Sequence, residues 1–150
     1  MFLQEVLAEL EGKFNIKMAQ STLRNYQNDG LISPAKRTSL GRWKGTVTEY
    51  PDDIIPEVYA AYMLQNGAIT TKPDMIKAAR KLIYAVENQL PEAALPEGLS
   101  RMLEMVCIIW LYYRELALTG KETAAEITVD KKGNVGVAFL DLETKERYSY

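Results

Sequence analysis

The chain has 150 residues, with one cysteine and no histidine. Hydrophobic residues make up 47% of it and charged residues 25%, which is typical of a folded globular chain rather than a disordered one. A single cysteine excludes an internal disulfide, and the lack of histidine removes the commonest general base and the commonest metal ligand. We therefore expect no enzymatic activity, no metal site and no cofactor, and the candidates for function are binding surfaces.

Charge is distributed unevenly along the chain. The net charge is −2, yet residues 13–50 carry seven Lys and Arg residues against only Asp29 and Glu49. A basic block of this kind favours a polyanionic partner such as nucleic acid. The strongest apolar run, residues 105–113, is far shorter than the roughly 20 residues that a membrane helix needs. Because the first residues also lack a signal-peptide pattern, we expect a cytoplasmic protein without a membrane contact.

Hydrophobic periodicity and turn residues give the predicted elements. Helices are expected over residues 2–14, 22–29, 51–67, 71–90 and 99–118. Gly30 follows the second helix and can take the left-handed conformation of a C′ residue. Strand-forming residues around turn glycines predict one hairpin over residues 35–50, with its tip at residues 41–45, and a second over residues 127–141. Residues 146–150 are a candidate third strand.

The fifth predicted helix is apolar almost all round, so we expect it to be buried in the subunit or against a partner. Its aromatic and methionine residues could instead line a small-molecule pocket, although a core or a dimer interface is the favoured interpretation. Cys107 lies between Val106 and Ile108, which predicts an inert, buried thiol. The C-terminal hairpin offers an edge that could pair across a two-fold axis.

The order helix, turn, helix, basic hairpin, helix indicates a winged helix-turn-helix. In such a module the second helix enters the major groove and the hairpin follows the DNA backbone. Arg can hydrogen-bond guanine, and Asn or Gln can pair with adenine. The residues expected to contact bases lie on or near the first turns of the second helix: Gln20, Ser21, Arg24 and Asn25. The residues expected to contact the DNA backbone are Tyr26, Lys36, Arg37, Arg42 and Lys44.

Two aromatic residues in this region have alternative roles. Tyr26 either donates to a phosphate or is a core tyrosine whose hydroxyl reaches the surface. Trp43, at the tip of the hairpin, either packs as an anchor or lies against the sugar-phosphate backbone, and we favour packing.

The same residues resemble a known family. The run from Thr22 to Tyr26, then Gly30-Leu31-Ile32, Pro34, Arg37, Gly41-Arg42 and Tyr50-Pro51-Asp52-Asp53, is similar to the recognition helix and wing of MerR-family regulators. The resemblance spans about residues 18–65 and implies a sequence-specific transcriptional regulator that binds double-stranded DNA as a homodimer and acts by distorting the duplex. Ala19 stands where the family has a helix-capping residue. The family's sensing cysteines and its long dimerising helix are missing, so metal or redox sensing is not implied.

The expected fold is mostly α with small β. Residues 1–68 are predicted to form a MerR-like winged-helix DNA-binding domain, and residues 69–150 a helical and β-hairpin region for dimerisation or regulation by an unidentified effector. Two other functions remain open. One is an architectural or mobile-element DNA-binding protein of the excisionase type. The other is a protein-interaction or ligand-binding adaptor on a winged-helix scaffold.

Overall fold

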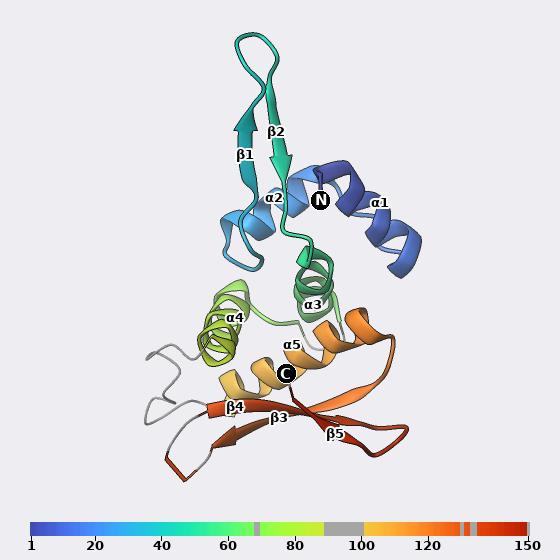
Figure 1. Cartoon of the computed structure of the whole chain (residues 1–150), viewed down its shortest axis with the longest axis vertical. Coiled ribbons are helices and arrows are strands. Elements are labelled where there is room, and N and C mark those ends of the chain that lie inside the picture. The colour runs from blue at the N-terminus through green and yellow to red at the C-terminus, as the bar shows by residue number, and fades with distance from the viewer. Residues whose placement is uncertain (68–69, 89–100, 130, 133–134, 150) are drawn as a thin grey trace.

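A computed structural model of the chain describes residues 1–67, 70–88, 101–129, 131–132 and 135–149. It is mostly helical with two small antiparallel sheets, which confirms the expected class (Figure 1). The helices are α1 (Leu3–Phe14), α2 (Gln20–Asn28), α3 (Ile54–Asn66), α4 (Pro73–Glu87) and α5 (Arg101–Thr119). The strands are β1 (Lys36–Ser39), β2 (Thr46–Glu49), β3 (Thr123–Val129), β4 (Val135–Asp141) and β5 (Arg147–Tyr148). The predicted loop at residues 91–98 lies outside the described residues.

The second helix ends as its sequence predicts. Gly30 has a φ of +74°, and its N–H donates to Gln27 O at 3.1 Å while the Leu31 N–H donates to Tyr26 O at 2.9 Å. These two bonds satisfy carbonyls that a helix end would leave without partners, and they turn Leu31 into the core. At the other end the N-cap is Ala19, which supplies no side-chain hydrogen bond.

The first hairpin is attached to the start of the chain. Strands β1 and β2 pair in register from Lys36 opposite Glu49 to Ser39 opposite Thr46. Beyond β2, the Tyr50 N–H donates to Met1 O at 2.6 Å and the Met1 amine donates to Tyr50 O at 2.7 Å. This long-range pairing, which the sequence pattern does not predict, holds the root of the hairpin while its tip projects away from the helices (Figure 1).

Helix α3 is the central element, and it is buried on more than one side. The sequence pattern predicts an apolar face made of Ile55, Val58, Tyr59, Tyr62 and Met63, and of these Ile55 and Val58 are buried while the other three are partly buried. The residues of α3 that are fully buried or nearly so are Ile54, Ile55, Pro56, Val58, Ala60, Ala61 and Leu64. Burial extends beyond the predicted face because α3 packs against α1 and α2 as well as against α4 and α5.

Helix α5 lies between α4 and the three-stranded sheet, which has the order β3-β4-β5 (Figure 1). Phe139 faces α5 and is 1% exposed, and its ring stacks on that of Tyr148 at 5.4 Å between centroids. Burial of α5 is incomplete, since Met102 and Met105 are 66% and 55% exposed. The predicted second hairpin and third strand are both present, although β3 begins at Thr123, four residues earlier than expected.

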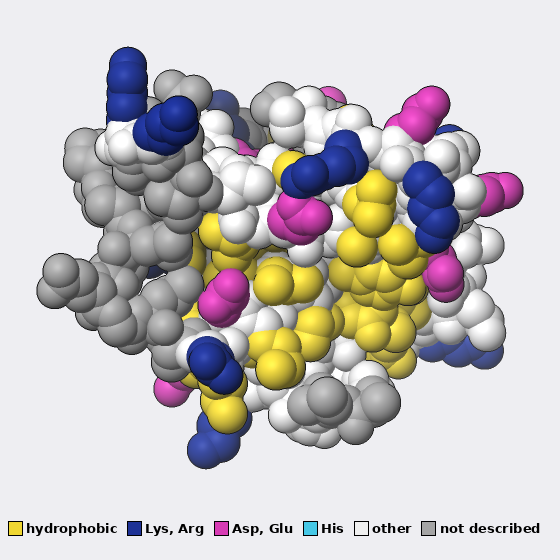
Figure 2. All heavy atoms as spheres, turned by 90° about the horizontal axis from the view of Figure 1, so that it is seen from below, with side chains coloured by type: hydrophobic (Ala, Val, Ile, Leu, Met, Phe, Trp, Pro, Cys, Tyr) yellow, Lys and Arg dark blue, Asp and Glu magenta, His cyan; other side chains and the backbone are white. Residues whose placement is uncertain are grey.

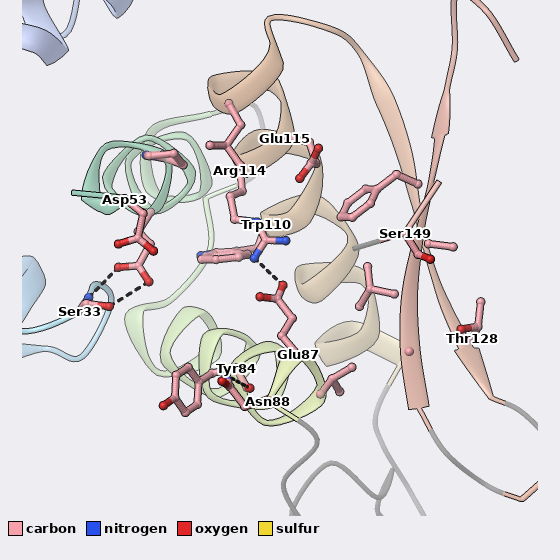
Figure 3. A pocket seen from close by; sticks show the side chains of 18 residues that line it. Ser33, Asp53, Tyr84, Glu87, Asn88, Trp110, Arg114, Glu115, Thr128 and Ser149 are labelled. Atoms are coloured by element: carbon pink, nitrogen blue, oxygen red, sulfur yellow. Dashed lines mark hydrogen bonds and ion pairs between the residues drawn. The ribbon is translucent and has the colours of Figure 1, made fainter. Parts of the chain in front are cut away.

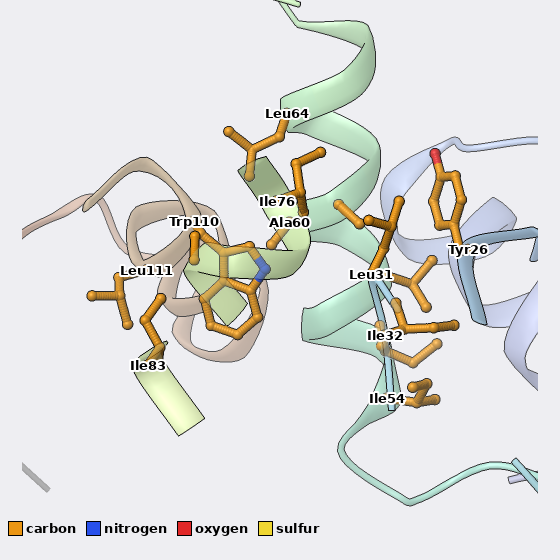
Figure 4. Close-up of a cluster of buried hydrophobic side chains, with 14 of the residues drawn as sticks. Tyr26, Leu31, Ile32, Ile54, Ala60, Leu64, Ile76, Ile83, Trp110 and Leu111 are labelled. Carbon is orange, nitrogen blue, oxygen red and sulfur yellow. The ribbon is translucent and has the colours of Figure 1, made fainter. Parts of the chain in front are cut away.

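One hydrophobic cluster runs through both halves of the chain. In Figure 4, α3 stands between Leu31 and Ile32, which follow α2, and Ile83, Trp110 and Leu111 of α4 and α5. The boundary expected after residue 68 falls inside this continuous packing. No helix within the described residues is long and apolar enough to cross a membrane.

Candidate nucleic-acid interface

Helix α2 presents a polar face to solvent. Gln20, Ser21, Arg24 and Asn25 are all exposed, and their spacing places them on one side of the helix. Leu23, on the opposite side, is fully buried and anchors the helix to the core. The structure thus brings the four predicted base-contacting residues together on an accessible surface.

Tyr26 does not belong to that surface. It is 5% exposed and packs in the core beside Leu31 (Figure 4). Burial raises the pKa of its hydroxyl to about 12, although a hydrogen bond with the Asn66 side chain acts in the opposite direction. The burial favours the core-tyrosine alternative, so we leave Tyr26 out of the DNA-facing set.

The side chain of Tyr50 is affected by charges on both α2 and the hairpin. Its side chain is 2% exposed, and its hydroxyl has no hydrogen-bond partner within the described residues. Burial raises the pKa of this phenol, while the positive charges of Arg24 on α2 and Arg37 on β1 lower it. Arg24 and Arg37 therefore both act electrostatically on this one phenol.

The cations of the hairpin do not all lie on one face of it. Neighbouring residues of a strand point to opposite faces, so Lys36 lies on the face away from Arg37, opposite Glu49. Because the side chains of Lys36 and Arg37 lie on opposite faces of the hairpin, we leave Lys36 out of the surface defined below. Arg42 and Lys44 lie at the tip and are exposed.

Trp43, between those two cations, is 94% exposed. The favoured interpretation, that this side chain packs as an anchor, is wrong. Two hydrogen bonds close the tip, from Leu40 N–H to Gly45 O at 3.0 Å and from Lys44 N–H to Gly41 O at 3.2 Å. Trp43 has a φ of +73° within this turn, which is uncommon for a bulky residue.

We call Arg24, Arg37, Arg42 and Lys44 the basic surface. None of the ion pairs within the described residues involves any of the four. Five other Lys and Arg side chains form ion pairs within the described residues, among them Arg80 with Glu57 at 3.5 Å and Arg114 with Glu87. Exposed cations without an ion-pair partner attract anions.

A groove lies between the first turn of α3, α4, α5 and the three-stranded sheet (Figure 3). This groove has a volume of about 790 Å³. Arg114 lies over the Trp110 ring at 5.2 Å from its centroid and pairs with Glu87. The Trp110 indole N–H is buried without a hydrogen-bond partner among the described residues. Sequence reasoning missed this groove, because four elements far apart in the chain form it; the aromatic residues of α5 were the only signal.

The groove offers no arrangement for catalysis that we can identify. Within the described residues, no three Asp, Glu or Cys side chains are grouped so that they could hold a metal ion. Cys107 is fully buried, and burial raises the pKa of its thiol to about 11, so it is not a poised nucleophile.

Comparisons of the chain with protein-family profiles, curated proteins and solved structures found no match. The functional argument therefore rests on the surfaces described above.

Proposed function

We propose that the chain is a winged helix-turn-helix protein that binds double-stranded DNA, with α2 in the major groove and the β1–β2 hairpin as the wing. The observation that carries this proposal is the basic surface, whose four cations on α2 and the hairpin are exposed and form no ion pair within the described residues. In line with the resemblance to MerR regulators, we propose a sequence-specific transcriptional regulator.

The two elements divide the work of recognition. Arg24 and Asn25 on the exposed face of α2 are the donors and acceptors that suit base edges. Arg37, Arg42 and Lys44 neutralise phosphates, which adds affinity but little sequence information. At about 3.3 Å per residue, the β1–β2 hairpin extends roughly 20 Å from its root to its tip. This length exceeds the ~12 Å width of the major groove. The tip therefore meets a different part of the duplex from α2.

We further propose that the chain acts as a homodimer. Figure 2 views the end of the molecule opposite the hairpin, where hydrophobic side chains gather between a few charged ones. Leu140 of β4 and its partner Ala124 of β3 point away from α5, since their neighbours Phe139 and Ala125 point inward. A two-fold contact there leaves both hairpins free for two half-sites. Sedimentation equilibrium should give twice the chain mass of 17.0 kDa, and a monomer at all concentrations refutes this part.

Duplex binding over a series of salt concentrations tests the main proposal. After selection of bound genomic fragments, Arg24→Ala should weaken binding to the selected site by about 5- to 150-fold, since a bidentate base contact is worth about 1–3 kcal/mol. The double change Arg42→Ala and Lys44→Ala should weaken binding to every duplex and reduce the slope of log K against log salt by about 1.8, or ~0.9 for each phosphate contact.

Lys81→Ala is the matched control, because it removes an exposed cation from α4, away from the hairpin. It should leave both affinity and slope unchanged. Equal losses in the control and in the hairpin variants would refute the assigned surface, and no salt-dependent duplex binding at all would favour the adaptor alternative. Footprints dispersed over many sites, rather than one short palindrome, would favour an architectural protein.

A further inference from the structure

The tip of the hairpin holds a large apolar side chain where the chain itself offers no contact. Trp43 is 94% exposed, whereas Trp110, the other tryptophan, is 2% exposed. Tryptophan is usually well covered in folded proteins, so an indole left in water at the end of a projecting ribbon indicates a surface reserved for a partner. Its neighbours Arg42 and Lys44 are both cationic and exposed.

This arrangement specifies the chemistry of the partner. Two cations flanking an indole suit a surface that alternates negative charge with flat apolar groups. Nucleic acid has both, as phosphates and base faces, and base–aromatic stacking contributes to binding in a sequence-tolerant way. The basic surface of α2 and β1 continues toward the same tip, which favours DNA over an anionic membrane as the partner.

We infer that Trp43 is a wedge that inserts its indole at a base step in the minor groove flanking the site of α2, while Arg42 and Lys44 hold the phosphates on either side. This inference rests on the proposed DNA binding and adds a mechanism of distortion to it. Apolar side chains inserted from the minor groove unstack a base step and kink the duplex. Two hydrogen bonds, Leu40 N–H to Gly45 O and Lys44 N–H to Gly41 O, each join a residue before Trp43 to one after it. They fix the conformation of the tip in the free protein.

Intrinsic fluorescence gives a direct test, because the two tryptophans differ so strongly in exposure. The emission difference between the wild type and Trp43→Phe reports on the exposed indole. In the free protein that component should be quenched readily by acrylamide. On addition of the selected duplex it should be quenched by the bases and become protected from acrylamide. Placing 2-aminopurine at the flanking step should give brighter emission as the step unstacks.

Affinity and bending measurements complete the test. Trp43→Ala should weaken duplex binding by about 5- to 150-fold, the range expected for losing one base–aromatic stack, and should reduce the bend seen by energy transfer between the duplex ends. Trp43→Phe should retain most of both. Tyr84→Ala is the matched control, since Tyr84 is an aromatic residue of α4 that is 57% exposed. It should change neither affinity nor bend.

The outcomes separate the wedge from the proposed function. If the wild type binds DNA but Trp43→Ala binds equally well, or binds less well with no change in 2-aminopurine emission or bend, the wedge is refuted and DNA binding stands. If the wild type does not bind duplex, both ideas fail. A blue shift of the Trp43 emission with phosphatidylserine vesicles and none with DNA would also overturn the inference, because it would assign the tip to an anionic membrane.

Discussion

Removal of the Glu57 carboxylate of α3 is predicted to be costly, because three groups depend on it. The Ser33 backbone N–H donates to one carboxylate oxygen at 2.8 Å, and the Ser33 hydroxyl donates to the other at 3.0 Å. Arg80 of α4 lies 3.5 Å from the same carboxylate and also donates to the Ser33 hydroxyl at 2.7 Å. The side chains of Arg80 and Glu57 are only 20% and 16% exposed. The contact joins the segment before the hairpin to the helical body.

Glu57→Ala removes two hydrogen bonds to a charged acceptor, each worth about 1.5–3 kcal/mol, and leaves Arg80 half-buried without its counter-ion. Solvent access lets the site relax, so we expect a loss of about 3 kcal/mol in the free energy of unfolding. For a chain of this size, that corresponds to a fall in Tm of roughly 6–12 °C. Glu57→Gln keeps an acceptor for the Ser33 N–H and should lose about half as much.

Urea unfolding followed by circular dichroism at 222 nm measures this loss, with an unchanged m-value as the check that the transition remains two-state. Glu143→Ala is the matched control, since Glu143 is an exposed carboxylate in the turn between β4 and β5. It should stay within about 0.5 kcal/mol of the wild type. The reasoning fails if Glu57→Ala is as stable as this control.

Four further results are expected. Gly30→Ala should lower stability by about 1–2 kcal/mol, because the φ of +74° is unfavourable for a side chain; unchanged urea unfolding would contradict this. Backbone N–H groups of the following turn hold the pKa of Asp141 below its usual value, so Asp141→Asn should be destabilising at neutral pH. That deficit should shrink as the pH falls below about 4, where the carboxyl group of the unfolded chain takes up its proton first, and should be lost below the lowered pKa of the native group; a deficit independent of pH refutes the assignment. Cys107 should react with a thiol reagent only as fast as the chain unfolds, and rapid labelling of the native protein would argue against its burial. Tyr26→Phe should leave duplex affinity within about twofold, since its buried hydroxyl makes no base or phosphate contact; a tenfold loss would restore the discarded role.

Sequence alone predicted the features that depend on neighbours along the chain. The end of α2 follows from the conformational freedom of Gly30, and the burial of Leu31 follows from the turn that Gly30 makes. The candidate base-contacting residues are exposed because they share one side of a short helix whose other side carries Leu23. Local pattern was sufficient in each case.

Features that depend on distant segments were missed. The pairing of Met1 with Tyr50 joins the two ends of a segment of about fifty residues, and no periodicity reports it. The apolar side chain of Trp43 predicts packing, whereas its exposure depends on the direction in which the hairpin projects. Strand alternation alone predicts that Lys36 and Arg37 lie on opposite faces of the hairpin, whereas the net charge of a segment carries no information about faces.

The central position of α3 ties the end of the molecule that carries α2 and the hairpin to the rest of the chain, so this end is not an independent module. A fragment cut after residue 67 would expose to water the flank of α3, including Ala60 and Leu64, that α4 and α5 now cover (Figure 4). New binding preferences can arise by exchange of the outward residues of α2, which leave the interior untouched. Transplanting the whole front segment onto a different helical body would instead require a new complementary surface for α3.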